Sequence, residues 1–210
     1  MRMRRLKWAP EFLENSDVVV HTPEENKGKW KEVLKRDSLH VEIGTGKGDY
    51  WITMSEMYPE IGWIGVEKNE SVAAMAVRKS GERVENRLFV QNDAANIDTW
   101  FAAGEVDVIH LNFSDPWPKK KASKRRLSHA SFLEKYKTIL SENGEIQMKT
   151  DNSQLFEYSI LQFLANGFEL IDFSVDFRRS EHPEDAITEY ESKFMEKGNP
   201  IYRAVYRKGK

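Results

Sequence analysis

From about residue 38 onward, short apolar runs alternate with stretches in which apolar residues recur every three or four positions. The runs have the length and the β-branched content of strands, whereas the intervening stretches are typical of amphipathic helices. The expected strands are 39–43, 61–66, 88–90, 106–113, 145–148, 168–177 and 201–206. The expected helices run from the glycine-rich turn after residue 43 to about residue 58, and over 71–79, 131–140 and 155–164.

This alternation predicts a Rossmann-like α/β fold, with a central, mostly parallel sheet and helices on both of its faces. Residues 38–210 are expected to form that single domain, and residues 1–37 a basic N-terminal extension that is partly flexible. Residues 106–113 are rich in apolar residues, as in a central strand that is covered on both faces. Because ligands bind at the carboxyl ends of such strands, we expect the functional residues there.

The composition excludes several classes of protein. The chain of 210 residues has no cysteine, so disulfide frameworks, thiol catalysis and cysteine-rich zinc sites are excluded. Its histidines show no metal-ligand spacing, and we expect no metal site. The charged N-terminus lacks the apolar stretch of a signal peptide, and no apolar run approaches the ~20 residues of a membrane-spanning helix. The expected compartment is therefore the cytoplasm, without a membrane partner.

Basic residues are concentrated in two short stretches, although the formal net charge is only −2. Ten Lys and Arg residues lie within 2–7 and 119–126, and neither stretch contains an acidic residue. The rest of the chain contains 22 basic and 34 acidic residues, which gives it a net charge of −12. Such a distribution favours local docking of a polyanion over non-specific coating of the surface.

A glycine-rich turn, Glu42-Ile43-Gly44-Thr45-Gly46-Lys47-Gly48, follows the first expected strand. A Walker loop is excluded, because Gly48 follows Gly46-Lys47 and Val41 stands where the first glycine is required. A dinucleotide fingerprint fails too, because Asp49 stands where its third glycine would lie. Together with Glu42, this residue would place carboxylates on both sides of a pyrophosphate, which the repulsion of like charges disfavours.

S-adenosylmethionine suits the turn better, because it has no phosphate and carries an ammonium and a sulfonium group. Gly44 and Gly46 let a ligand approach the backbone closely, and Glu42 suits its positive charge. Glu67, at the end of the second strand, can accept hydrogen bonds from both ribose hydroxyls. Asp93, shortly after the third strand, is placed to accept from the adenine amino group. Each acid alone is typical of a surface carboxylate or a helix cap, but three at successive strand ends favour a cofactor site.

The segment Phe113-Ser114-Asp115-Pro116-Trp117-Pro118 follows the most apolar strand. Its prolines fix their own φ and restrict the residues before them, so the segment presents the Asp115 carboxylate and the Trp117 ring stiffly. The basic run that follows implies a polyanion, which makes a nucleic-acid base the natural methyl acceptor. If the acceptor is N7 of guanine, its lone pair is free and no general base is needed. Asp115 is then the expected catalytic residue, because it can orient the base or the cofactor and stabilise the developing positive charge.

Six of the eight residues in 119–126 are basic. A solvated loop without a specific role is one explanation, but the position directly after Asp115 favours phosphate contacts around the target nucleotide. The side chains expected to bind these phosphates are Lys119, Lys121, Lys124, Arg125 and Arg126. Loss of each contact should lower the salt dependence of binding by about one unit of slope.

Taken together, these motifs resemble the bacterial tRNA (guanine-N7)-methyltransferases, which are class I S-adenosylmethionine-dependent enzymes. The matching segments cover nearly the whole chain in family order: Glu42 to Gly48, Gly65-Val66-Glu67, Asn112 to Lys120, Lys124-Arg125-Arg126, Lys149-Thr150-Asp151-Asn152 and Thr188-Glu189-Tyr190-Glu191. The tryptophan-containing segment with its basic run is highly specific, whereas the glycine turn alone is not. In one departure, Lys121-Ala122 replaces the usual Arg-His, which removes a bidentate phosphate fork and an imidazole.

The resemblance implies a class I methyltransferase fold and transfer of a methyl group from S-adenosylmethionine to guanosine 46 in the variable loop of tRNA, giving 7-methylguanosine. It implies cofactor contacts at Glu42, Glu67, Asp93 and Asp115, with Asp115 also catalytic. It further implies substrate contacts at Lys119, Asp151, Thr188, Glu189, Tyr190 and Glu191. The expected partner is tRNA, bound by a monomer or a homodimer.

Three alternatives stay open at this point. Another RNA base or DNA could be the acceptor, a NAD-dependent oxidoreductase could use the same sheet, and a tRNA-binding protein could carry the same basic run without catalysis. Label in a nucleoside other than 7-methylguanosine would favour the first. Stabilisation by NAD instead of S-adenosylhomocysteine would favour the second, and RNA binding without methyl transfer would favour the third.

Overall fold

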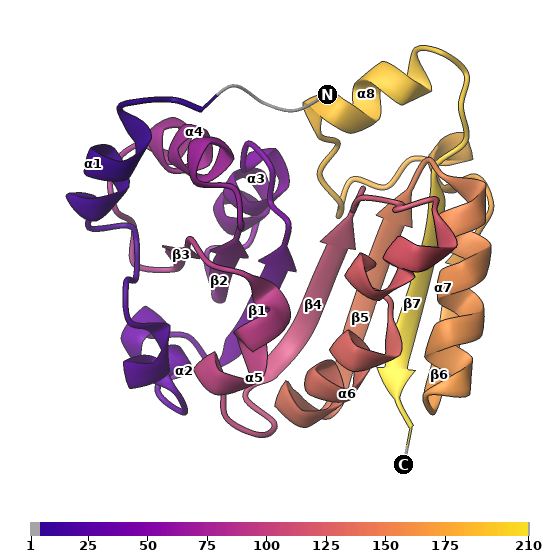
Figure 1. Ribbon diagram of the computed structural model, residues 1–210, viewed down its shortest axis with the longest axis horizontal. Helices are drawn as coiled ribbons and strands as arrows, with labels where there is room; N and C mark the ends of the chain where they lie inside the picture. The colour runs from indigo at the N-terminus through magenta and orange to yellow at the C-terminus, as the bar shows by residue number, and fades with distance from the viewer. Residues whose placement is uncertain (1–4, 210) are drawn as a thin grey trace.

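The computed structural model describes residues 5–209 (Figure 1). The strands are β1 (Ser38–Ile43), β2 (Ile61–Val66), β3 (Arg87–Val90), β4 (Val106–Asn112), β5 (Leu140–Thr150), β6 (Phe168–Ser174) and β7 (Tyr202–Lys208). The α-helices are α1 (Ala9–Glu14), α2 (Trp30–Leu34), α3 (Asp49–Met57), α4 (Glu70–Ser80), α5 (Ile97–Trp100), α6 (Ala130–Ile139), α7 (Ser153–Ala165) and α8 (Glu189–Met195). Short 3₁₀ helices are η1 (Pro23–Asn26), η2 (Ala94–Asn96), η3 (Lys120–Arg125) and η4 (Phe177–Arg179).

A single sheet of seven strands lies at the centre, in the order β3-β2-β1-β4-β5-β7-β6. Strands β1 to β5 pair in parallel, and β7 runs antiparallel to both of its neighbours. The prediction of a mostly parallel α/β sheet with helices on both faces is confirmed. The carboxyl ends of β1, β4 and β5 meet at the upper edge in Figure 1. Within residues 5–209, no helix is long and apolar enough to cross a membrane.

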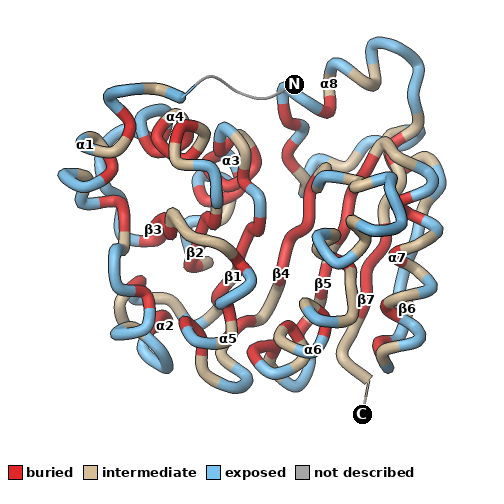
Figure 2. Tube along the Cα trace, viewed as in Figure 1, coloured by how far each residue is buried: buried red, intermediate tan, exposed pale blue. Residues whose placement is uncertain are grey.

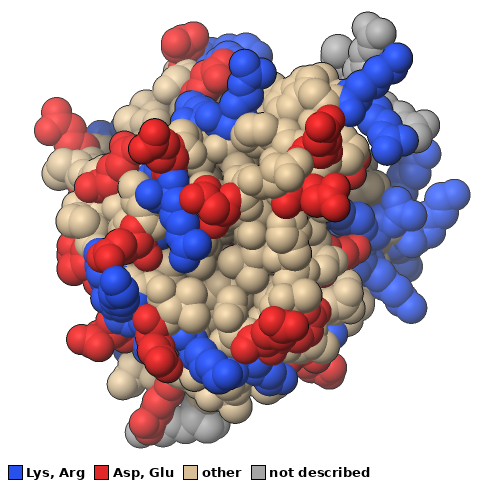
Figure 3. Space-filling model, turned by 90° about the vertical axis from the view of Figure 1, so that its left-hand side faces the viewer, with Lys and Arg blue, Asp and Glu red and all other residues tan. Residues whose placement is uncertain are grey.

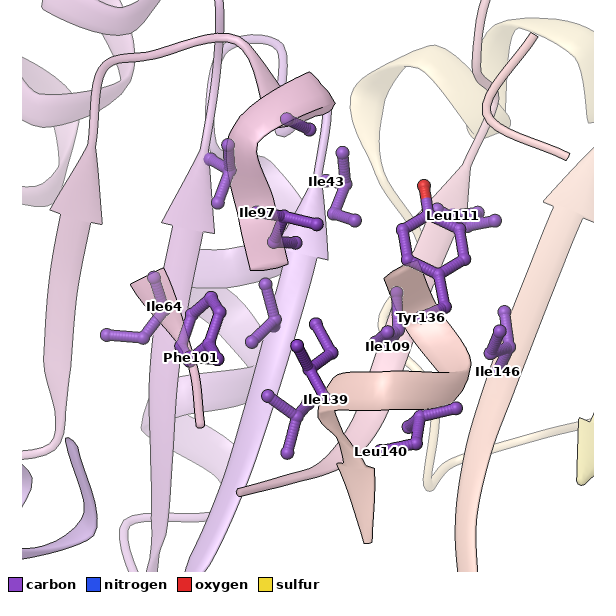
Figure 4. Packing of buried hydrophobic residues seen from close by; sticks show 14 of the residues in the cluster. Ile43, Ile64, Ile97, Phe101, Ile109, Leu111, Tyr136, Ile139, Leu140 and Ile146 are labelled. Carbon is purple, nitrogen blue, oxygen red and sulfur yellow. The ribbon is translucent and has the colours of Figure 1, made fainter. Parts of the chain in front are cut away.

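One face of the sheet carries the larger apolar core, to which α2, α5, α6 and α7 contribute. Alternate residues of β1, β2, β4 and β5 belong to it, among them Ile43, Ile64, Ile109 and Ile146 (Figure 4). Because successive side chains of a strand point to opposite faces, the residues between these must be accommodated on the other side.

The opposite face differs between its outer and its central strands. Beside β2 and β3, helices α1, α3 and α4 form a second apolar cluster with Trp63 and Phe89. The central strands β1, β4 and β5 are buried along much of their length (Figure 2). Their buried polar side chains on this face are Glu42, His110, Asn112 and Lys149. These groups need partners inside the protein, because an unpaired buried polar group is costly.

Residues 5–37 pack against the domain. Trp30 and Leu34 belong to the larger core, and α1 lies against α4. The N–H group of Leu6 donates to Ser71 Oγ at 2.9 Å. The core therefore extends across residue 37, where the expected extension ends. Arg2 and Arg4 of the basic stretch lie outside the described residues.

Helix α8 has no counterpart among the elements that the hydrophobic pattern predicts. Glu191 is the one side chain of α8 that is buried, so the helix lacks the apolar stripe on which pattern-based prediction depends. Strand β5 also begins earlier than expected, at Leu140, directly after α6. The other expected strands and helices are present, with ends that differ by a few residues.

Candidate active site

The glycine-rich turn joins β1 to α3 at the upper edge of the sheet (Figure 1). The N–H groups of Gly44 and Thr45 both donate to the Val66 carbonyl oxygen, at 2.8 and 3.1 Å, which ties the turn to β2. Gly46 has a φ of +56°, and a Cβ atom there would meet no atom within 4 Å. Glycine therefore suits the backbone conformation at this position, and the space beside it is open to a ligand.

A cavity of about 280 Å³ lies against this turn. Two groups of predicted site residues line it together: Glu42, Gly44 and Gly46 from the end of β1, and Thr188, Glu189 and Tyr190 from the start of α8. Asn112 and Phe113, at the end of β4, also contribute to the lining. The structure thus brings candidates for cofactor binding and for substrate binding to one place at the carboxyl edge of the sheet.

Glu42 is buried, with 2% of its surface exposed, and its carboxylate is only half satisfied. Oε1 accepts a hydrogen bond from Asn112 Nδ2 at 3.0 Å, whereas Oε2 has no partner among residues 5–209. Burial raises the pKa of Glu42 to about 7, against the opposing effects of Asn112 and of the positive charge on Lys149. An unpartnered carboxylate oxygen beside a cavity fits a ligand with a cationic donor, such as an ammonium group.

Glu67 and Asp93 follow β2 and β3, as expected, and both already accept hydrogen bonds from the backbone. Glu67 accepts from the N–H groups of Gly46 and Asn69, at 3.2 and 2.8 Å, and burial raises its pKa. Asp93 accepts from the Ala95 N–H group at 3.0 Å and so caps η2. A carboxylate oxygen can accept more than one hydrogen bond, so both side chains can still receive a ligand hydroxyl or amino group.

The catalytic candidate Asp115 is exposed on a strained loop between β4 and η3. Phe113 and Trp117 have φ values of +51° and +40°, which residues with side chains rarely adopt. The negative charge of Asp115 contributes to a raised pKa at both Glu67 and Tyr190, although burial is the larger cause at each. Asp115 therefore lies close enough to Glu67 and to Tyr190 for its charge to act on both.

The start of α8 presents substrate candidates to the cavity. The hydroxyl of Thr188 caps the helix, and Glu189 is exposed beside it. The Tyr190 ring lies 5.1 Å from the Phe113 ring, measured between centroids, and Tyr190 is 48% exposed. Asp151, after β5, contributes to the raised pKa of Tyr190 and therefore lies near it, and burial raises the pKa of Asp151 itself.

Glu191 departs from the expectation of a substrate contact. It is 0% exposed, and Lys149 and Arg178 engage its two carboxylate oxygens. It is absent from the cavity lining, to which Thr188, Glu189 and Tyr190 contribute. The candidates Glu67, Asp93, Asp115 and Asp151 do not line this cavity either. Neighbouring positions on a helix point in different directions, so one motif can place some side chains at a ligand and another in the interior. The burial and the two ion pairs of Glu191 favour a structural role for this side chain.

The basic run forms helix η3 and its flanking residues. Lys119, Lys121, Lys124 and Arg125 are exposed, and the Arg125 guanidinium lies 4.9 Å from the centre of the Trp117 ring. Figure 3 shows a protruding group of Lys and Arg side chains at one rim of the molecule, whereas the rest of that face mixes both signs. The exposed side chains of the run are accessible to a polyanion.

Arg126 differs from the rest of the run. It donates from Nε to the Pro116 carbonyl oxygen at 2.9 Å and from Nη2 to the Trp117 carbonyl oxygen at 3.0 Å. Its guanidinium also lies 4.1 Å from the centre of the Tyr158 ring. The planar fork thus holds two successive carbonyl groups directly after Asp115, in the loop between β4 and η3.

Asn112, Tyr50 and Lys149 lie around Glu42. Asn112 and Lys149 belong to segments that match the family, but the sequence assigned a role to none of the three. Asn112 and Lys149 stand at the carboxyl ends of β4 and β5, where a polar residue alternates with buried apolar ones. That alternation, which also places His110 on the same face, is the signal that could have revealed them. Tyr50 occupies an ordinary position on α3 and offers no such signal.

The raised pKa of Glu42 predicts a stability effect that depends on pH. The neutral carboxyl group stabilises the fold relative to the charged one, so this stability is fully present below the ordinary pKa of 4.5 and is lost as the pH rises through about 7. Glu42→Gln is neutral at every pH, and at pH 8 it should raise the free energy of unfolding by about 2–3 kcal/mol. The gain should fall below about 1 kcal/mol at pH 5.

Denaturant unfolding at pH 5 and pH 8 measures this difference. Glu60→Gln, at an exposed glutamate, is the control and should change the stability little at either pH. A gain for Glu42→Gln that is the same at both pH values would contradict the assignment of a raised pKa to Glu42.

The chain is similar to proteins of a known family along nearly all of its length. Residues 36–204 match the family model described as "Putative methyltransferase". The tRNA (guanine-N(7)-)-methyltransferase of Oceanobacillus iheyensis is 43% identical, over 97% of this chain and 97% of its own. The protein of the same name from Streptococcus agalactiae serotype III is 44% identical, over 99% of this chain and 100% of its own.

Solved structures share the fold at much lower identity. An antibiotic-related methyltransferase superposes with a TM-score of 0.61 over 85% of this chain and 92% of its own, at 15% identity. The 16S rRNA methyltransferase KamB gives a TM-score of 0.60 over 87% and 94%, at 11% identity. These likenesses establish the class I methyltransferase fold, and the full-length identity to the relatives above establishes the family. The chain belongs to the tRNA (guanine-N7)-methyltransferase family.

Proposed function

We propose that this chain is a tRNA (guanine-N7-)-methyltransferase that uses S-adenosylmethionine to methylate N7 of guanosine 46 in the variable loop of tRNA. The observation that carries the proposal is the cavity lined by both Glu42 and Tyr190, where a half-satisfied carboxylate and an exposed aromatic ring come together. The names of the relatives support the same activity. The enzyme is expected to act in the cytoplasm as a monomer or a homodimer.

The acidic side chains around the β1 turn fit S-adenosylmethionine better than a dinucleotide. Oε2 of Glu42 is free to accept from the α-ammonium group, while Glu67 and Asp93 suit the ribose hydroxyls and the adenine amino group. Asp49 also lines the cavity and adds negative charge that would repel a pyrophosphate. When bound, the cofactor supplies an electrophilic methyl group on its sulfonium. These features argue against the NAD-dependent alternative.

Asp115 and Tyr190 suit a guanine acceptor. N7 of guanine offers a free lone pair, so no proton has to be removed before the bond to the methyl group forms. Asp115 can accept from the N1–H and amino groups, which orients the ring, and its charge stabilises the positive charge that the ring gains. The exposed ring of Tyr190 offers a face for stacking, and Asp151 lies near it as a second acceptor.

The exposed basic side chains next to the catalytic loop suit the tRNA backbone. Lys119, Lys121, Lys124 and Arg125 can bind phosphates around the target nucleotide, which positions the RNA without reading its sequence. The base then has to leave its stack to reach the cavity. A non-catalytic tRNA-binding protein would need the basic run but not a half-satisfied carboxylate beside a cavity.

Methyl transfer to tRNA tests the proposal directly. The chain is incubated with an unmodified tRNA transcript and methyl-labelled S-adenosylmethionine, and the RNA is digested to nucleosides and separated. Label is expected in 7-methylguanosine, and a transcript with adenosine in place of guanosine 46 should take up none. Label in any other nucleoside would refute the proposed acceptor. Thermal stabilisation by NAD but not by S-adenosylhomocysteine would refute the proposed cofactor.

Asp115→Ala should abolish measurable turnover while binding of S-adenosylhomocysteine weakens only partly. Asp115 acts on charge that develops during transfer, whereas Glu42 and Glu67 still hold the cofactor. We expect single-turnover rates to fall by a factor of about 10² or more, with a change of less than about 10-fold in the calorimetric Kd. Retained turnover would remove Asp115 from the catalytic role.

Arg126→Ala and Arg125→Ala should affect different kinetic parameters. Arg126 holds carbonyl groups of the catalytic loop, so its loss is expected to lower kcat by about 10-fold or more and to leave the salt dependence of tRNA binding nearly unchanged. Arg125 is exposed, so its loss should raise the KM for tRNA and lower the salt slope by about one unit. An equal drop in the salt slope for both variants would contradict the positioning role of Arg126.

A further inference from the structure

Helix α8 is attached to the domain through a charged side chain. A surface helix normally buries an apolar stripe, whereas Glu191 is the one buried side chain of α8. The helix stands above the carboxyl ends of β4 and β5, apart from the helices that cover the faces of the sheet (Figure 1). Its orientation therefore depends strongly on what holds Glu191.

Two cations hold the two oxygens of Glu191 separately. Lys149 Nζ lies 3.2 Å from Oε2, and Arg178 Nε lies 2.6 Å from Oε1. Lys149 belongs to β5 and Arg178 to η4, so the carboxylate is tied to two different elements. Hydrogen-bonded contacts from two directions restrict a carboxylate to one orientation, which an apolar contact does not do.

Asp185 ties the loop before α8 to the same two cations. Its Oδ2 lies 2.6 Å from Lys149 Nζ and 2.5 Å from Arg178 Nη2. Its Oδ1 accepts from the Tyr50 hydroxyl at 2.9 Å, which connects the loop to α3. We call Lys149, Arg178, Asp185 and Glu191 the anchor cluster. Its two positive and two negative charges balance in a region where every side chain is at most 11% exposed.

The anchor cluster adjoins the residues that line the cavity. The N–H group of Glu191 donates to Thr188 Oγ1 at 3.0 Å, and Tyr190 is its neighbour in the chain. The ring of Tyr50, which also lines the cavity, lies 4.7 Å from Lys149 Nζ. A displacement of Glu191 would therefore move both Thr188 and Tyr190.

We propose that Glu191 is a positioning residue, which Lys149 and Arg178 clamp so that Thr188 and Tyr190 face the acceptor base, and that it does not touch the base itself. The inference rests on the proposed function for the identity of that base, and on the ion pairs alone for the attachment of α8. It gives Lys149 and Arg178 a part in substrate recognition, although both side chains are almost completely buried.

Hydrogen exchange tests the attachment without any substrate. In Glu191→Gln, the amides of 189–195 should exchange at least about 10-fold faster than in the unchanged chain, because α8 opens locally while peptides from α6 keep their protection. Glu196→Gln, at an exposed glutamate just after the same helix, is the matched control and should leave the exchange unchanged. Equal protection of 189–195 in Glu191→Gln and in the unchanged chain would overturn the proposal.

Steady-state kinetics with unmodified tRNA test what the attachment does. In Glu191→Gln, the KM for tRNA should rise about 10-fold, while the Kd for S-adenosylhomocysteine stays within about threefold because the β1 turn is untouched. Partial unfolding alone would lower the concentration of active sites and leave KM unchanged. An unchanged KM would therefore overturn the positioning role.

A double variant separates positioning from direct contact with the base. Arg178→Lys keeps the charge but loses the guanidinium fork. The double variant combines Glu191→Gln with Arg178→Lys. If Glu191 acts through Arg178, its KM for tRNA should be close to that of the single variant with the higher KM. If the increase in KM of the double variant equals the product of the two single increases, Glu191 acts independently of Arg178, which would overturn the proposal.

The attachment of α8 can be tested even if Glu191→Gln fails to fold or if the chain transfers no methyl group to tRNA. If Glu191→Gln does not fold, Arg178→Lys takes its place in the exchange experiment, with faster exchange of 189–195 supporting the clamp and unchanged exchange overturning it. If the unchanged chain transfers no methyl group to tRNA, the proposed function fails. Exchange in 189–195 would then still decide whether the anchor cluster holds α8.

Discussion

The burial of charge on one face of β1, β4 and β5 is the constraint on which the rest of the molecule depends. Strand geometry directs Ile109 and Met148 to the apolar core, so their neighbours His110 and Lys149 must lie on the opposite face. A buried charge is tolerated only with partners close by, and the sheet itself supplies few. The segment between β6 and β7 brings Asp185, Arg178 and Glu191 over the strand ends to meet that need. The path of this segment, and with it the position of α8, follows from the charges beneath it.

The two buried glutamates Glu42 and Glu191 differ in how many of their carboxylate oxygens have a partner within the protein. Both oxygens of Glu191 are held by cations, and the side chain is 0% exposed and does not line the cavity. Glu42 has one oxygen bound to Asn112 and one without a partner, and burial raises its pKa to about 7. A cationic ligand would provide the missing partner for Oε2 of Glu42 and favour the ionised form of this side chain. Burial of this carboxylate therefore costs stability at a pH above its raised pKa, as is common where a site must stay ready for a ligand.

The sequence allowed prediction of most strands and helices and of the positions of the acidic candidates, because both follow from local pattern. Glu42 lies near the end of β1, and Glu67 and Asp93 follow β2 and β3. Because strand ends in a parallel sheet converge on one edge, their placement at that edge could be inferred from their order alone. The contacts of Arg126 and Glu191 could not be inferred in this way. Arg126 binds backbone carbonyls, which no residue type reveals, and Glu191 lies in a motif whose other members face the cavity. Helix α8 was equally hidden, because ion pairs replace the apolar stripe that predicts a helix.

Surfaces of opposite charge lie a short length of chain apart at the candidate site. Carboxylates surround the β1 turn, where a cationic cofactor fits, while exposed Lys and Arg side chains follow the catalytic loop, where a polyanion fits. The loop between them is strained at Phe113 and Trp117, and strain persists only where surrounding contacts enforce it. Arg126 supplies such contacts and belongs to the basic run itself. The segment that would receive the RNA backbone therefore also holds Asp115 in place, which links the docking of phosphates to the geometry of the reacting base.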